Sequence, residues 1–281
     1  MALLDAVLDV VQHEYAKSEP VWKTSRILPT DLTFLEMECA EPSEFDPFGW
    51  RKEMFDKYKK GEAEAEVREC AYGRVVALGE QRISHDIPWG LWGRILRLYH
   101  NASQPKAKIF FLATPYLRTI GKGTKPLGPE NINGGYTYSC NMETIVIYRA
   151  EDATRVLLHE LQHASCLDHK EHGTDLVEAE TEAWAELMYA GLLSQGKKPL
   201  FYELVKKQAD WMQAQNAVVK RHIHHERQFP WRYTVGKEEV WCRWGLVEGH
   251  MHAKHASHSL RLTPPPSAAL KRAFGIDSNI L

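Results

Sequence analysis

The segment VLLHELQHA, residues 156–164, constrains the fold of this chain more than any other part. It places His159, Glu160 and His163 among apolar residues. Residues four apart lie one above the other on the same face of an α-helix, so the two imidazole rings can converge on one point. Polar groups taken out of water need partners, because burial without them costs free energy. The spacing therefore predicts a buried helix that holds a metal ion, with His159 and His163 as two of its ligands.

The glutamate next to His159 has a different expected role. In the pattern H-E-x-x-H, the glutamate does not bind the metal but takes a proton from the attacking water and delivers it to the leaving group. We therefore expect Glu160 to act as the general base. A catalytic zinc ion has three protein ligands and keeps one position open, so the chain must supply a third ligand.

Two parts of the chain offer that third ligand. His169 extends the pattern to H-E-x-x-H-x-x-C-x-x-H, but Cys166 stands where the chain must turn sharply and glycine turns more easily. Alternatively, Glu178 and Glu182 are four apart in an expected helix over 175–194. One of these carboxylates can bind the metal while the other orients a ligating histidine through its second ring nitrogen. Together with Glu186, the same two residues could instead form a solvated acidic stripe along this helix.

The motifs LLHELQH and LVEAETEAWAEL together resemble the gluzincin metallopeptidases, and they look like the gluzincin-type zinc peptidases that large DNA viruses encode. The resemblance implies one zinc ion bound by His159, His163 and Glu178, with Glu160 as general base and Glu182 orienting a histidine. Val177 stands where the family has asparagine, and the gap from His163 to Glu178 is shorter than in the thermolysin branch. Glu182 therefore remains an alternative third ligand.

A zinc peptidase also needs a late side chain that stabilises the negative oxygen of its tetrahedral intermediate. The tract HIHHERQFPWRY offers His224 and Tyr233 for this role. Histidines near the end of a basic helix are also favoured by the helix dipole, so the tract has a structural explanation as well.

The segments around the motif predict an α+β fold of the zincin type. Apolar and aromatic runs at 107–116 and 144–150 predict strands, and 133–139, NGGYTYS, is expected to be an edge strand that pairs with substrate backbone. Helices are expected over 151–165, 175–194 and 199–221, around a small mixed or antiparallel sheet. The charged segment 54–71 is also expected to be helical.

Three regions are expected along the chain. Residues 1–100 are predicted to form an N-terminal helical cap, 101–248 the metallopeptidase core, and 249–281, with its triple proline, an extended tail.

Composition limits the partners of the chain. A net charge of -2 over 281 residues does not favour binding to nucleic acid. The sequence contains no run of eighteen or more apolar residues, which is the length needed to span a membrane. Five widely spaced cysteines without a CxxC pair argue against a disulfide framework. We therefore expect a reducing compartment such as the cytoplasm, or a virion.

The expected function is zinc-dependent hydrolysis of peptide bonds in a peptide or protein substrate. The alternative is a zincin-derived structural protein with a retained zinc site, which joins a larger assembly such as a virion through its terminal segments.

Overall fold

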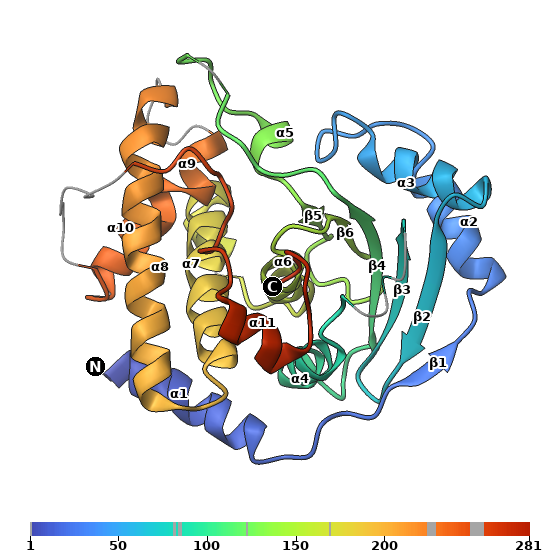
Figure 1. The fold of residues 1–281 in the computed structure, drawn as a ribbon, viewed down its shortest axis with the longest axis horizontal. Helices are drawn as coiled ribbons and strands as arrows, with labels where there is room; N and C mark the ends of the chain where they lie inside the picture. Colours follow the sequence, from blue (N-terminus) through green and yellow to red (C-terminus); the bar gives the residue numbers. More distant parts are fainter. Residues whose placement is uncertain are drawn as a thin grey trace. The chain divides into compact units, whose positions relative to one another are not determined.

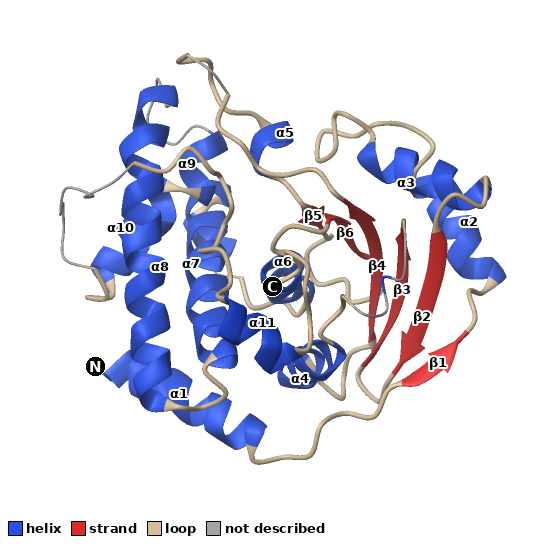
Figure 2. Ribbon diagram, in the orientation of Figure 1, coloured by secondary structure: helices blue, strands red, loops and turns tan. Residues whose placement is uncertain are grey.

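The computed structural model describes residues 2–80, 83, 86–121, 123–168, 170–223, 229–247 and 256–281. Across these residues the protein is a mixed α+β structure with eleven α-helices and one six-stranded sheet (Figure 2). The chain forms two compact units. The sheet unit comprises Glu19–Leu117, Asn133–Leu167 and Pro266–Leu281, and the helical unit comprises Met1–Ser18, Arg118–Ile132 and Asp168–Pro265.

The elements alternate irregularly along the chain. The strands are β1 (Lys23–Ser25), β2 (Glu64–Glu69), β3 (Gly73–Gly79), β4 (Ala107–Thr114), β5 (Gly135–Tyr136) and β6 (Ile145–Arg149). The helices are α1 (Ala2–Tyr15), α2 (Pro29–Glu38), α3 (Trp50–Lys59), α4 (Trp89–Tyr99), α5 (Pro129–Ile132), α6 (Ala153–Ala164), α7 (Thr174–Leu193), α8 (Lys198–Val219), α9 (Phe229–Tyr233), α10 (Val235–Arg243) and α11 (Ala268–Phe274).

The sheet is mixed, with the order β1-β2-β3-β4-β6-β5. β3, β4 and β6 run parallel, whereas β1, β2 and β5 pair antiparallel with their neighbours. All five residues of β6 are buried. Four of them, Ile145 to Tyr148, form the continuous apolar run that is typical of a parallel strand covered on both faces. The antiparallel strand β5 ends the sheet beside β6.

Helices cover both faces of this sheet (Figure 1). On one face, α2 and α3 contribute Leu35, Met54 and Phe55 to a core that includes Phe110 and Val146 of the sheet. The other face carries α4 and α6. The ring of Trp92 in α4 lies 5.5 Å from the ring of Phe111, and its indole N–H donates to the hydroxyl of Thr154 in α6 at 2.9 Å. The sheet and α4 thus hold α6 in place.

The last residues of the chain support the start of α6. The backbone N–H groups of Asp152 and Thr154 donate to the carbonyls of Asn279 and Ile280, both at 2.9 Å. The first N–H groups of a helix have no partner within the helix, so the tail satisfies two donors that would otherwise need water. The tail was expected to be extended, but it contains the short helix α11, which Ser267 caps through the N–H of Leu270.

The helical unit has its own core. Leu4, Val7, Leu8 and Val11 of α1 recur at helical spacing and are buried in a cluster with residues of α7, α8 and α10. Close packing explains Gly191 in α7, because a β-carbon there would lie 3.0 Å from the side chain of Val11. None of the described helices is both long enough and apolar enough to cross a membrane.

Several sequence predictions are confirmed. The strands expected at 107–116 and 144–150 are β4 and β6, and the helices expected at 151–165, 175–194 and 199–221 are α6, α7 and α8. The edge strand expected at 133–139 is confirmed only for the two residues of β5, Gly135–Tyr136.

The prediction of one helix over 54–71 was wrong. Helix α3 ends at Lys59, and the sequence EAEVRE forms β2. Charged and apolar residues alternate from Glu64 to Arg68, which is the period of a strand. Val67 is buried in the core that α2 and α3 form with the sheet. The first hundred residues, expected to be helical, therefore also supply the three strands β1, β2 and β3.

Candidate metal centre

Helix α6 lies within the core of the sheet unit. All of its residues from Ala153 to Ala164 are buried except His163. The exposed fraction is 6% for His159 and 4% for Glu160. The predicted burial of this helix is confirmed, and its polar side chains are held in a largely dry environment.

The two histidines of α6 lie side by side. Their Nε2 atoms are 3.1 Å apart, and the ring planes are inclined at 78°. Two imidazoles on one tetrahedral zinc ion have nitrogens about 3.3 Å apart, because each Zn–N bond is about 2.0–2.1 Å. The separation therefore fits a shared zinc ion. Without a metal, the same distance allows one ring to donate an N–H to the other.

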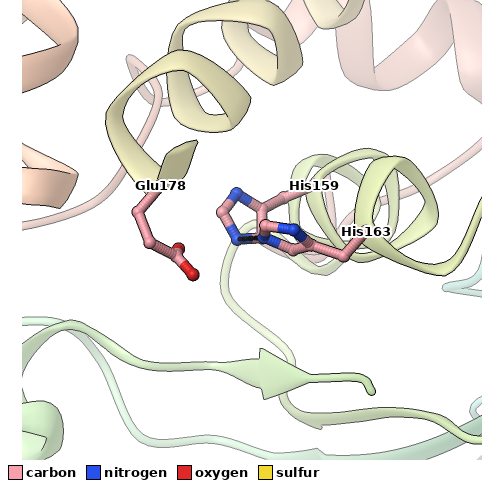
Figure 3. A group of neighbouring side chains, drawn as sticks. All are labelled: His159, His163 and Glu178. Atoms are coloured by element: carbon pink, nitrogen blue, oxygen red, sulfur yellow. Dashed lines mark hydrogen bonds between the residues drawn. The ribbon is translucent and has the colours of Figure 1, made fainter. Parts of the chain in front are cut away.

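Glu178 completes a group of three ligand atoms. One ligand atom from each of His159, His163 and Glu178 lies within 4.8 Å of the other two (Figure 3). Glu178 comes from the second turn of α7 and is half-buried. Two imidazole nitrogens and one carboxylate oxygen form a donor set that suits a catalytic zinc ion.

The carboxylate of Glu160 lies next to the edge strand. A β-carbon on Gly135 of β5 would be 3.3 Å from Oε1 of Glu160 and 2.7 Å from a methyl group of Val156. The absence of a side chain at position 135 thus leaves room for the carboxylate. Gly135 was not among the site residues predicted from the sequence, although the dipeptide Gly134-Gly135 at the start of an expected strand was a usable signal.

Glu182 lies one turn beyond Glu178 and has a different partner. The ammonium group of Lys237 lies 2.8 Å from a carboxylate oxygen of Glu186 and 3.8 Å from one of Glu182. All three side chains are at least 97% buried. The alternative of a solvated acidic face is therefore wrong for Glu182 and Glu186. A buried cation reduces the repulsion between these two carboxylates.

The remaining candidates are not brought into the group of three. His169 and His224 lie outside the described residues. Tyr233 ends α9, and its ring packs 5.0 Å from the ring of Phe229, next to a small core that includes Leu127 and Val219. The roles predicted for His224 and Tyr233 stay predictions.

Cys166 lies in the turn after α6, at the position where the longer histidine motif favours glycine. Cys166 has φ 59°, a left-handed conformation that glycine adopts more easily. Its sulfur is bonded to that of Cys140, with 4.6 Å between the two Cα atoms. The expectation that the cysteines form no disulfide was therefore wrong for this pair. Two segments far apart in the sequence meet here, which the spacing of the cysteines did not reveal.

The cysteines outside this bridge are Cys39, Cys70 and Cys242, which are free. Burial raises the pKa of the Cys39 thiol to about 12 and also raises the pKa of Cys70. Both therefore remain protonated at neutral pH, and a protonated thiol is a poor metal ligand.

Comparisons of the chain with protein-family models, with curated proteins and with solved structures find no match. The interpretation of the site therefore depends on its own chemistry. That chemistry consists of a paired donor set on a buried helix, a carboxylate on the adjacent helical position, and an edge strand next to that carboxylate.

Proposed function

We propose that the protein is a zinc-dependent metallopeptidase with a zincin-like fold of the gluzincin type. The observation that supports this most strongly is the 3.1 Å separation of the His159 and His163 Nε2 atoms on a buried helix that also carries Glu160. Glu178 is the proposed third ligand, because one of its carboxylate oxygens lies within 4.8 Å of a ring nitrogen of each histidine.

The donor set leaves one zinc position for chemistry, since catalytic zinc ions have three protein ligands. When bound, zinc lowers the pKa of a coordinated water to about 7 and polarises a carbonyl oxygen. Glu160 would accept the proton of the attacking water and transfer it to the nitrogen of the leaving group.

The edge strand supports a peptide as the substrate. β5 ends the sheet, so its outer edge can pair with an extended backbone by strand addition. A peptide aligned there would run beside Gly135, whose missing side chain brings the strand close to Glu160. We propose that the scissile carbonyl lies next to this glycine.

The alternative function is a structural protein that joins a larger assembly, such as a virion, through its termini. The described termini pack within the chain instead. α1 is buried in the core of the helical unit, and Ile276, Ile280 and Leu281 are each at most 4% exposed. A reducing compartment or a virion remains a prediction for its location.

The proposal is tested by metal content and turnover together. Elemental mass spectrometry should find one zinc per chain in untagged wild-type protein, and the wild type should cleave members of a fluorescence-quenched peptide library. Glu160→Gln should keep the zinc and lose cleavage, whereas His159→Ala should lose both. Undiminished cleavage by Glu160→Gln would contradict the proposed base, and wild-type protein without zinc would contradict the metal centre.

A further inference from the structure

The Cys140–Cys166 bridge lies at the end of the helix that carries the histidine pair. It joins the turn that follows β5 to the residues that follow α6. Both cysteines are exposed, and their neighbours Tyr138 and Leu167 are 53% and 59% exposed. The bridge is therefore accessible to a reductant, whereas the thiols of Cys39 and Cys70 are buried.

Both bridged residues also bind the backbone of a proposed metal ligand. The N–H of Cys140 donates to the carbonyl of His163 at 2.9 Å, and the N–H of Cys166 donates to the same carbonyl at 3.2 Å. The carbonyls in the last turn of a helix have no partner within the helix, so these bonds fix the turn that carries His163. The bridge holds both donors in place at once.

The backbone shape of the bridge strengthens this connection. Cys140 has φ 63° and Cys166 has φ 59°. Left-handed conformations cost a residue with a side chain about 1 kcal/mol and persist only where the surrounding structure imposes them. Cleavage of the bridge would release both turns to relax, and the Cys140 turn could then leave the carbonyl of His163.

We propose that this bridge is a site of thiol–disulfide exchange and that its reduction loosens the hold of the protein on its metal. The proposal depends on the zinc centre proposed above. A thiolate of a dithiol attacks one sulfur of the bridge, the S–S bond breaks, and a mixed disulfide forms with one cysteine. The second thiol of the reductant then closes its own disulfide, so the dithiol loses two electrons and two protons and both cysteines become thiols.

The expected size of the effect follows from residues that orient metal ligands in other proteins. Loss of such an outer partner lowers metal affinity by about 10–100-fold. The carbonyl bonded by Cys140 and Cys166 belongs to a ligand residue itself. We therefore expect zinc to leave the reduced protein at least about tenfold faster than the oxidised protein.

The experiment measures transfer of zinc from the loaded full chain to a chromogenic pyridylazo chelator. Wild-type protein is compared before and after reduction with a phosphine and capping with iodoacetamide, next to a Cys140→Ser/Cys166→Ser variant. Cys242→Ser, which changes a half-buried free thiol, is the matched control. We expect fast release from the capped protein and the double variant, and wild-type release from Cys242→Ser.

A second measurement separates this role from general stabilisation of the fold. A bridge that only stabilises the fold would lower the melting temperatures of zinc-loaded and zinc-free protein equally when it is removed. The proposal expects the difference between these two temperatures to shrink. If the double variant does not fold, the capped wild type supplies the same comparison.

Three outcomes overturn the proposal in distinguishable ways. Five titratable thiols in unfolded protein that was never reduced would show that the bridge does not form. Equal zinc release and an unchanged temperature difference in the two redox states would overturn the coupling alone. Wild-type protein that binds no zinc would overturn the metal centre as well.

Discussion

The carboxylate of Glu160 and the backbone of Gly135 lie so close that a β-carbon on Gly135 would be 3.3 Å from Oε1. One residue comes from α6, the helix that carries the two proposed histidine ligands, and the other from the edge strand β5. This relationship links the proposed base to the strand that would align a peptide.

Substitution of Gly135 should therefore impair catalysis without removing the metal. The new methyl group in Gly135→Ala would press on Val156 and shift Glu160 or β5. A displacement of about 1 Å can cost about 100-fold in rate, so we expect a loss of this order in kcat with normal zinc content. Gly121→Ala is the control, because a β-carbon there meets nothing within 4 Å. Wild-type kcat in Gly135→Ala would contradict the positioning role.

The third ligand can be identified by zinc content in variants of α7. Glu178→Ala should lose most of its zinc, because two histidines alone hold the ion weakly. Glu182→Ala should keep its zinc, since this carboxylate lies near Lys237. Glu180→Ala controls for changes to the helix, because Glu180 pairs with His172 and Arg243. Loss of zinc only in His169→Ala would favour the longer histidine motif.

The buried cation Lys237 should matter for stability. Lys237→Met leaves the buried carboxylates of Glu182 and Glu186 without their shared ammonium group. Removal of one partner of a buried ion pair costs about 3–5 kcal/mol. We expect the free energy of unfolding, measured with urea, to fall by about this amount. Lys206→Met removes a pair with Asp210 that is more than 60% exposed, and should change stability by at most about 0.5 kcal/mol. Equal effects of the two substitutions would contradict the assignment.

The stability of the sheet unit should depend on pH through Asp31. Burial alone would raise the pKa of Asp31, but hydrogen bonds from Lys108, Arg74 and the N–H of Leu28 outweigh it and hold the pKa below its usual value. A carboxyl whose pKa is lower in the folded state stabilises the fold above its unfolded pKa, about 3.9. This stabilisation is lost as the pH falls through the lower, folded pKa.

Chemical unfolding between neutral and acidic pH checks this prediction. Asp31→Asn should be less stable than wild type at neutral pH by about 3 kcal/mol, because two cations lose their buried partner. The difference should shrink at the acidic end of the range. A difference that stays constant with pH would show that Asp31 does not contribute through its charge.

Local spacing determined much of what the sequence alone could show. The four-residue interval between His159 and His163 requires a helix for the rings to meet, and α6 has the expected bounds within two residues at each end. Helical periodicity likewise located α7 and α8, and continuous apolar runs located β4 and β6. These features depend on the geometry of a single element, which repeats every few residues.

The tertiary structure decided which distant segments meet. Cys140 and Cys166 are 26 residues apart and pair only because the turn after β5 reaches the end of α6. Lys237 pairs with Glu186, which lies 51 residues earlier in the chain. Gly135 lies next to Glu160, and the sequence predicted the strand of Gly135 but not the side chains beside it. Periodicity shows which face of an element is buried, but not what covers it. That partner depends on how the whole chain packs, because apolar burial is non-directional and favours many alternative pairings equally.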